Sequence, residues 1–240
     1  VIDASPSTPL GLGEIAGKAG LNMATTSRIL ETLCNEGYVE QIAPKKGYIL
    51  GPMAYDLGSH GEYRRDLVFA SGPALDQFTA DCNEAVLVAV LQGSRRIVLT
   101  EKESTRDIQA RPSSQIYDPA ASATGRLLLA WLDEREQSIW LKAHGVPSAT
   151  IWPEVMTEAD VYHAFSVIRQ TERALIRRDE VVGLAVPIWS SGGVTGTLGC
   201  HLPRYRFTPE DEEMLWDALS RHAQRIGANL EHPQKERDNT

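Results

Sequence analysis

The first 35 residues carry apolar side chains at the spacing of two α-helices. Positions three or four apart are apolar in residues 12–19 and again in residues 23–35: Leu12, Ile15, Ala16, Ala19, Ile29, Leu30 and Leu33. Between these segments stand Gly20, Leu21 and Asn22, and a glycine permits the tight turn that joins two short helices. The spacing predicts a helix-turn-helix, a motif whose second helix can lie in the major groove of DNA.

Two short β-forming segments follow Gly37. They are residues 38–42 and residues 48–50, and the sequence between them, residues 43–47, contains Pro44, Lys45, Lys46 and Gly47. Turn-forming residues such as proline and glycine between two apolar runs predict a β-hairpin. With two lysines at its tip, this hairpin resembles the wing of a winged helix.

Helical character resumes after the Gly58–Gly61 break. We expect a linker helix over residues 59–71 and a new helix that begins at Ser71, Gly72 and Pro73, because proline is accommodated in the first turn of a helix.

The rest of the chain alternates strand and helix patterns. We expect strands at residues 84–91, 95–101, 108–111, 184–189 and 194–202, and helices at residues 122–131, 134–143 and 161–170. Thr208 begins a long final helix whose apolar stripe is Leu215, Leu219, His222, Ile226 and Leu230. The predicted fold class is α+β: a five- or six-stranded antiparallel sheet flanked by helices, with residues 233–240 as a disordered polar tail.

Composition narrows the function classes. The 240 residues are 42% hydrophobic and 23% charged, contain no long apolar run, and include three widely spaced cysteines, so we expect a soluble cytoplasmic protein. The sequence has no GxSxG, HExxH, Walker A or dinucleotide-binding motif. We therefore expect no enzymatic activity, no cofactor and no metal site.

The charge is unevenly distributed. The chain has a formal net charge of −8, but residues 1–65 contain six basic and seven acidic side chains, whereas residues 71–232 contain sixteen basic and twenty-two acidic ones. Most of the negative charge therefore lies in the C-terminal part. The basic residues of the N-terminal part fall in the second helix, at the hairpin tip and at Arg64 and Arg65, where they can meet phosphates.

Both halves resemble one family. Leu12-Gly13-Glu14-Ile15-Ala16, Gly20-Leu21, Arg28-Ile29-Leu30, Gly37-Tyr38-Val39 and Tyr48-Ile49-Leu50-Gly51 are similar to the winged helix of the IclR family of bacterial transcriptional regulators. Pro119–Ala130 and Ala185-Val186-Pro187-Ile188 are similar to that family's GAF-like effector-binding domain. The resemblance implies a winged helix-turn-helix at residues 1–58, a linker helix at 59–71 and an effector-binding domain at 72–232. It also implies that the first helix of the winged helix is largely missing before Leu12, and thus a longer native chain.

The resemblance makes residues 23–35 the recognition helix. Its helical phase buries Thr26, Ile29, Leu30 and Leu33, so the expected DNA-binding residues are Thr25, Ser27 and Arg28, together with Lys45 and Lys46 of the wing. For Arg28 the alternative is a surface ion pair with Glu31 or Glu36.

The expected effector site combines a helix start with one sheet face. Small residues at Ser122-Ala123-Thr124-Gly125 can expose backbone N–H groups to a carboxylate, and the resemblance implies effector contacts at Ala123, Thr124 and Gly125. By alternation Gly199 and His201 share a strand face, and the resemblance adds Gly183. His201 can hydrogen-bond or pair with an acidic ligand, and the alternative is a structural histidine with its hydrogen bonds satisfied. The tryptophans can form a wall for an aromatic ligand, with core packing or dimer contact as the alternative; they are Trp140, Trp152 and Trp189. A basic rim for an anionic effector can form at Arg173, Arg177 and Arg178, with a solvated charge run as the alternative.

Taken together, the sequence predicts a DNA-binding repressor of a catabolic operon, controlled by a small carboxylate or aromatic metabolite. The resemblance implies homodimers and dimers of dimers on operator DNA. The alternatives are a ligand-sensing module that acts through protein contacts and, less favoured, a small-molecule enzyme.

Overall fold

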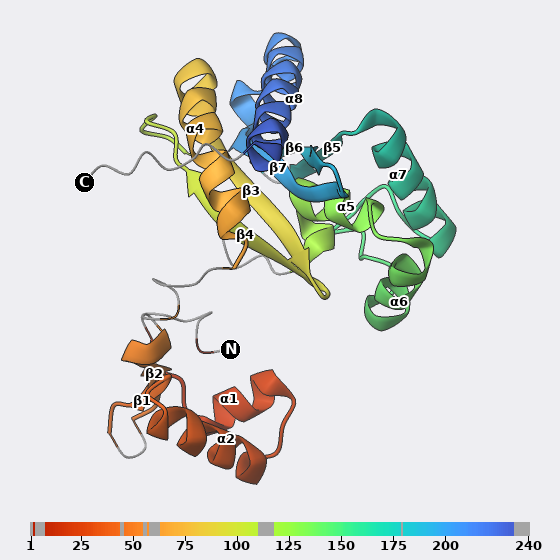
Figure 1. Ribbon diagram of the computed structural model, residues 1–240. Coiled ribbons are helices and arrows are strands. Elements are labelled where there is room, and N and C mark those ends of the chain that lie inside the picture. The colour runs from red at the N-terminus through yellow and green to blue at the C-terminus, as the bar shows by residue number, and fades with distance from the viewer. Residues whose placement is uncertain are drawn as a thin grey trace, which may run out of the picture. The chain divides into compact units, whose positions relative to one another are not determined.

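The computed structural model describes residues 2, 8–43, 46–54, 57, 63–109, 118–178 and 180–232 (Figure 1). The chain divides into two compact units, Val1–Tyr63 and Arg64–Thr240. Lys45, the start of the expected linker helix and the expected tail at residues 233–240 lie outside the described residues.

The first unit contains the two predicted helices. α1 (Leu12–Ala19) ends at Gly20, which has a φ of 67°, the left-handed conformation that glycine adopts at little cost. α2 (Met23–Asn35) begins after Asn22, whose side chain accepts a hydrogen bond from the Thr25 N–H. The helix-turn-helix therefore follows from one glycine and one N-cap residue.

The hairpin completes this unit. β1 (Val39–Gln41) pairs antiparallel with β2 (Tyr48–Leu50), and Leu10 forms an isolated bridge to Tyr48. A small core joins helices and hairpin; its buried residues are Leu10, Ile15, Leu30 and Val39.

The second unit begins with one long helix, α4 (Arg65–Cys82), where we expected two. Pro73 lies inside this helix rather than at its start. Burial explains the continuity: Ser71 and Ala74 are buried, and Asn229 from the last helix donates to the Ala70 carbonyl. Tertiary packing offsets the hydrogen bond that Pro73 cannot donate, so the expected boundary at residues 71 and 72 falls within a single helix.

A five-stranded antiparallel sheet forms the centre of the second unit, in the order β4-β3-β7-β6-β5. The strands are β3 (Ala85–Gln92), β4 (Arg95–Lys102), β5 (Ala174–Arg178), β6 (Val181–Ser190) and β7 (Gly193–Pro203). The predicted α+β class is confirmed. The expected strand at residues 108–111 is wrong for Ile108 and Gln109, which are not in a strand, and Ala110 and Arg111 lie outside the described residues.

α4 and α8 (Pro209–Glu231) lie side by side and pack on one face of the sheet (Figure 1). We call it the α4/α8 face. Alternate strand residues point into this core, among them Val86, Val88, Leu184, Leu198 and Cys200. The predicted stripe of α8 is confirmed, since Leu215, Leu219, His222 and Ile226 are buried and Leu230 packs against the same core.

The opposite face carries α5 (Ala123–Ala130), behind which α6 (Glu134–His144) and α7 (Glu158–Thr171) complete a second core. We call it the α5 face. Ala123 and Leu127 of α5, Trp140 of α6 and Phe165 of α7 are buried there together with Ala185 of β6. No helix within the described residues is long and apolar enough to span a membrane.

Candidate functional sites

The exposed side of α2 is the candidate nucleic-acid interface. Thr25, Ser27 and Arg28 are all exposed, while the Thr26 side chain turns inward, is 2% exposed and donates to the Asn22 carbonyl. The predicted outward positions of these three residues match the structure. Within the described part of the chain, Arg28 forms no ion pair with Glu31 or Glu36, so its guanidinium can reach a base edge or a phosphate.

The prediction that Ile29 is buried is wrong. Ile29 is 44% exposed, and it lines an apolar groove of about 340 Å³ with Ile15, Leu21, Leu33 and Leu50. The helical phase was assigned correctly, because Leu30 is buried beside it. Phase says which way a side chain points but not whether another element covers it.

Of the two wing lysines, Lys46 is described and exposed. Arg64 belongs to the second unit, where its guanidinium donates to the Thr195 carbonyl at 3.0 Å. Arg65 stacks over the Phe69 ring, with its guanidinium carbon 4.9 Å from the centroid. This arginine pair is thus engaged within the second unit.

The expected effector residues meet beneath the start of α5. A Cβ atom on Gly199 would lie 2.4 Å from the Thr124 methyl group, and one on Gly183 would lie 3.0 Å from Ile176 and 3.8 Å from Ala123. A Cβ atom on Gly125 would lie 2.2 Å from the Pro119 carbonyl oxygen. Glycine at position 199 therefore lets the first turn of α5 rest directly on β7, and glycine at position 125 lets the Pro119 backbone approach α5.

The α5 start is less open to an anion than the sequence suggests. Ser122 is the N-cap residue, and its hydroxyl accepts a hydrogen bond from the Gly125 N–H at 3.1 Å. One of the backbone donors expected for a carboxylate is thus already paired. His201 stands opposite Gly183 across the β6–β7 pair and is 9% exposed.

Two buried arginines that the sequence does not predict lie near this site, Arg96 and Arg126. Arg96 of β4 is 3% exposed and donates from Nε to the Thr124 hydroxyl at 2.6 Å. Burial lowers the pKa of Arg96 to about 10, a change that Glu101 opposes, so the side chain remains charged at neutral pH. Strand alternation between Arg95 and Arg96 was the only sequence signal, since one of two neighbours in a strand must face inward.

Arg126 of α5 is the second buried arginine. It donates to the carbonyls of Ala120 and Ile151 and lies 4.2 Å from the Trp152 ring centroid. Burial lowers its pKa to about 10, while Glu154 acts in the opposite direction. These bonds fasten the segment before α7 to the α5 start.

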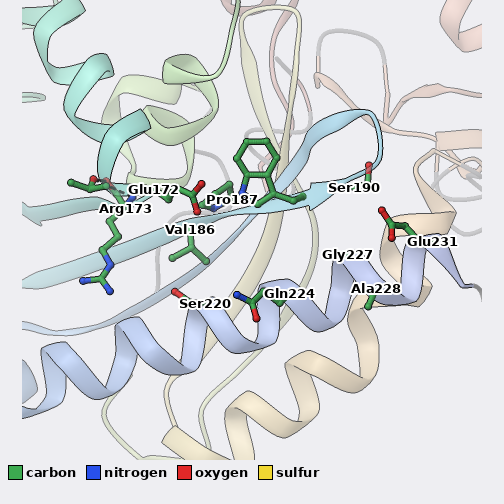
Figure 2. A pocket seen from close by; sticks show the side chains of 12 residues that line it. Glu172, Arg173, Val186, Pro187, Ser190, Ser220, Gln224, Gly227, Ala228 and Glu231 are labelled. Carbon is green, nitrogen blue, oxygen red and sulfur yellow. Dashed lines mark hydrogen bonds between the residues drawn. The ribbon is translucent and has the colours of Figure 1, made fainter.

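The tryptophans separate into two groups. Trp140 and Trp152 are buried in the core behind α5, as the core-packing alternative predicts. Trp189 is 40% exposed and meets Trp131 edge-to-face at 4.7 Å. It lines a cavity of about 550 Å³ between β6 and α8 (Figure 2).

Of the three arginines in the expected basic rim, Arg173 and Arg177 do not face the α5 start, whereas the charge of Arg178 acts on Arg126 of α5. Arg173 lies 5.1 Å from the ring centroid of Trp216, and Arg177 forms an ion pair with Glu212 at 3.4 Å. Both partners belong to α8, so these arginines lie toward the α4/α8 side of the sheet edge.

Each of the two units matches a known protein family model. Residues 4–43 match the family model of the IclR helix-turn-helix domain, and residues 63–228 match that of the bacterial transcriptional regulator IclR C-terminal domain. The acetate operon repressor of Salmonella typhimurium is 28% identical over 144 residues, which span 59% of this chain and about half (53%) of that relative.

Solved structures show the same fold. An IclR transcriptional regulator from Silicibacter sp. TM1040 has a TM-score of 0.78 and 24% identity, covering 92% of this chain and 89% of that one. An IclR homologue from Microbacterium hydrocarbonoxydans, complexed with 4-hydroxybenzoate, has a TM-score of 0.72 and 19% identity, covering 95% and 93%. Because a family model matches well over half of its length, this chain belongs to the IclR family of bacterial transcriptional regulators.

Proposed function

We propose that this chain is a DNA-binding repressor that reads its operator with α2. The observation that carries the proposal is the exposed side of α2, where Thr25, Ser27 and Arg28 stand next to a capped helix start. Arginine can form paired hydrogen bonds to guanine, and hydroxyl side chains can bind either a base edge or a phosphate. Lys45 and Lys46 of the wing supply further phosphate contacts.

The proposed repressor acts as a homodimer, and two dimers associate on longer operators. A two-fold symmetric pair presents two recognition helices to a pseudo-palindromic site. Its target is a catabolic operon, and a small carboxylate or aromatic metabolite controls it. The supporting relatives are the acetate operon repressor and the IclR homologue complexed with 4-hydroxybenzoate.

We place the effector site on the α5 face, at Ala123, Thr124, Gly125, Gly183, Gly199 and His201. Support comes from their convergence: Thr124 touches Gly199, Ala123 approaches Gly183, and His201 pairs with Gly183 across the strands. Binding there relieves repression if the effector favours the conformation of the dimer that binds DNA more weakly.

Two experiments test whether α2 recognises the operator sequence. Bound sequences are selected from random DNA, and fluorescence anisotropy titrations then measure the affinity for the selected sequence. Arg28→Ala is expected to weaken binding of the selected sequence by about 1–3 kcal/mol and to relax specificity at one or two base pairs. Lys142→Ala is the matched control, because it removes one exposed positive charge from α6. Equal binding by wild type and Arg28→Ala contradicts the proposal and favours a sensor that acts through protein contacts.

The salt dependence of DNA affinity tests whether the wing contacts phosphates. Because the first 65 residues are nearly neutral, we expect a modest slope of log K against log salt, to which each phosphate contact contributes about −0.9. Lys46→Ala should reduce the slope by about one such contact without changing sequence preference. A slope of zero in the wild type excludes phosphate contacts by α2 and the wing.

A further inference from the structure

Arg96 is a buried charge on the α5 face of the sheet, where the β3–β4 hairpin contributes the apolar side chains Leu87, Ala89 and Val98. It pairs with Leu91 across the β3–β4 hairpin and is 3% exposed, whereas its neighbour Arg95 is exposed. Placing a guanidinium in such surroundings carries a desolvation cost. A hydrophobic residue at this strand position would pack without that cost, so the arginine calls for a functional explanation.

The contacts of Arg96 lead to the first turn of α5. Its Nε donates to the Thr124 hydroxyl at 2.6 Å, and that hydroxyl lies 3.4 Å from the Ser122 hydroxyl, the N-cap of α5. The methyl group of Thr124 fills the space above Gly199. Thr124 therefore occupies a position between the guanidinium and the glycine-lined part of β6 and β7.

We propose, on the basis of the function proposed above, that Arg96 binds the carboxylate of the effector, which displaces the Thr124 hydroxyl from the guanidinium. A carboxylate is the better acceptor, because a charge-assisted hydrogen bond is roughly twice as strong as one to a neutral group and the guanidinium fork matches its two oxygens. The glycine contacts leave no room for a ligand atom between Thr124 and Gly199, so entry at this point requires movement of Thr124.

The charge of Arg96 and its apolar surroundings also indicate which class of ligand binds. An acid with one carboxylate and a compact apolar body suits a buried arginine that pairs with Leu91 on a face where Leu87, Ala89 and Leu128 form an apolar cluster. The matching amide has the same shape but carries no charge. Arg96 therefore predicts that acids bind in preference to their amides.

Arg96 has a purely structural alternative, in which it only holds Thr124 and α5 on the sheet. The two roles separate in a pair of variants. Arg96→Gln removes the charge but keeps an N–H donor, whereas Thr124→Val keeps the charge and the shape but removes the hydroxyl. Under the proposal the first variant loses acid binding, and the second binds acid more tightly because the competing acceptor is gone.

The experiment measures thermal stabilisation and affinity of the full chain with benzoate, 4-hydroxybenzoate and phenylacetate, each against its amide at equal ionic strength. Arg95→Gln is the matched control, with the same charge change at the neighbouring exposed position. For any acid that the wild type binds, we expect Arg96→Gln to lose at least about tenfold in affinity, Arg95→Gln to stay within about threefold, and Thr124→Val to gain affinity.

Three results overturn the inference. They are the absence of any acid that stabilises the wild type more than its amide, unchanged acid affinity in Arg96→Gln, and equal losses in Arg96→Gln and Thr124→Val. A Thr124→Val affinity equal to that of wild type contradicts the displacement of Thr124. Operator binding by the same preparations reports separately on the proposed function, since Arg96 and the α2 residues belong to different units.

Discussion

The two faces of the central sheet differ in what they bury. The α4/α8 face buries large apolar side chains such as Phe78, Leu219 and Ile226, each fully enclosed. The α5 face brings glycines 183 and 199 against the first turn of α5 and buries Arg96, Thr124 and His201 nearby. Apolar contacts contribute stability at little cost, whereas buried polar groups must be hydrogen-bonded or they destabilise. The difference indicates a structural face and a face suited to recognition.

The largest expected effect lies on the α4/α8 face. Phe78→Ala removes a fully buried ring from the contact between α4 and α8 and should lower the free energy of unfolding by about 3–5 kcal/mol in urea denaturation. Ile139→Ala, on the exposed side of α6, is the control and should cost less than about 1 kcal/mol. A loss of the same small size for Phe78→Ala would show that this face is not the main source of stability.

A smaller effect is expected on the α5 face. Gly199→Ala places a methyl group 2.4 Å from the Thr124 side chain and 3.0 Å from the Leu184 carbonyl, so we expect a loss of about 1–3 kcal/mol. Adding Thr124→Ala should restore part of this loss, because it removes the clashing methyl group. Gly192→Ala, in open space, should change stability by less than about 0.5 kcal/mol. Additive losses in the double variant would argue against close packing of α5 on β7.

The smallest effect is a pH dependence of the α4/α8 face. His222 is fully buried; its Nε2 lies 3.3 Å from the Asp81 carboxylate, and its Nδ1 has no hydrogen-bond partner among the described residues. Burial lowers the pKa of His222, an effect that Arg221 and Arg225 reinforce and that Asp81 opposes. Protonation would also bury an N–H at Nδ1 without an acceptor.

The sign of the pH effect follows from this lowered pKa. Between the folded and the unfolded pKa the unfolded chain binds more protons, so His222 stabilises the fold above about pH 6.5. That contribution is lost as the pH falls through the folded pKa. His222→Gln should flatten the fall in urea midpoint between pH 7.5 and 5.5, whereas His163→Gln, at an exposed position, should not. An equal fall in both variants would assign the pH effect to other groups.

The fold was predictable where one local signal decides the structure. Gly20 ends α1 and Asn22 caps the start of α2, so these two residues fix the turn of the helix-turn-helix, and Thr208 fixes the start of α8. β5 was missed because arginines at positions 177 and 178 resemble a solvated segment, although an edge strand tolerates such charges. Pro73 led to a wrong helix boundary for a different reason: Ser71 and Ala74 are buried inside the second unit, and this packing outweighs the local helix-breaking signal.

The candidate site was predictable only in part. Thr124, Gly183 and Gly199 were named from the sequence, and their close contacts require the folded sheet. Arg96 was not named, because strand alternation shows that either Arg95 or Arg96 faces inward but not which face α5 covers. Ile29 shows the same limit in α2, where the direction of a side chain does not determine its burial.

Hydrogen exchange with and without a bound acid tests the contrast between the two faces most directly. Amides of the α5 start, from Pro119 to Ala130, should change their exchange rates on addition of a stabilising acid, and this change should disappear in Arg96→Gln. Amides of α8 from Leu215 to Ile226 should change little, because they belong to the apolar core of the other face. Changes confined to α8, or an α5 response that persists in Arg96→Gln, would contradict the assignment of the α5 face as the recognition face.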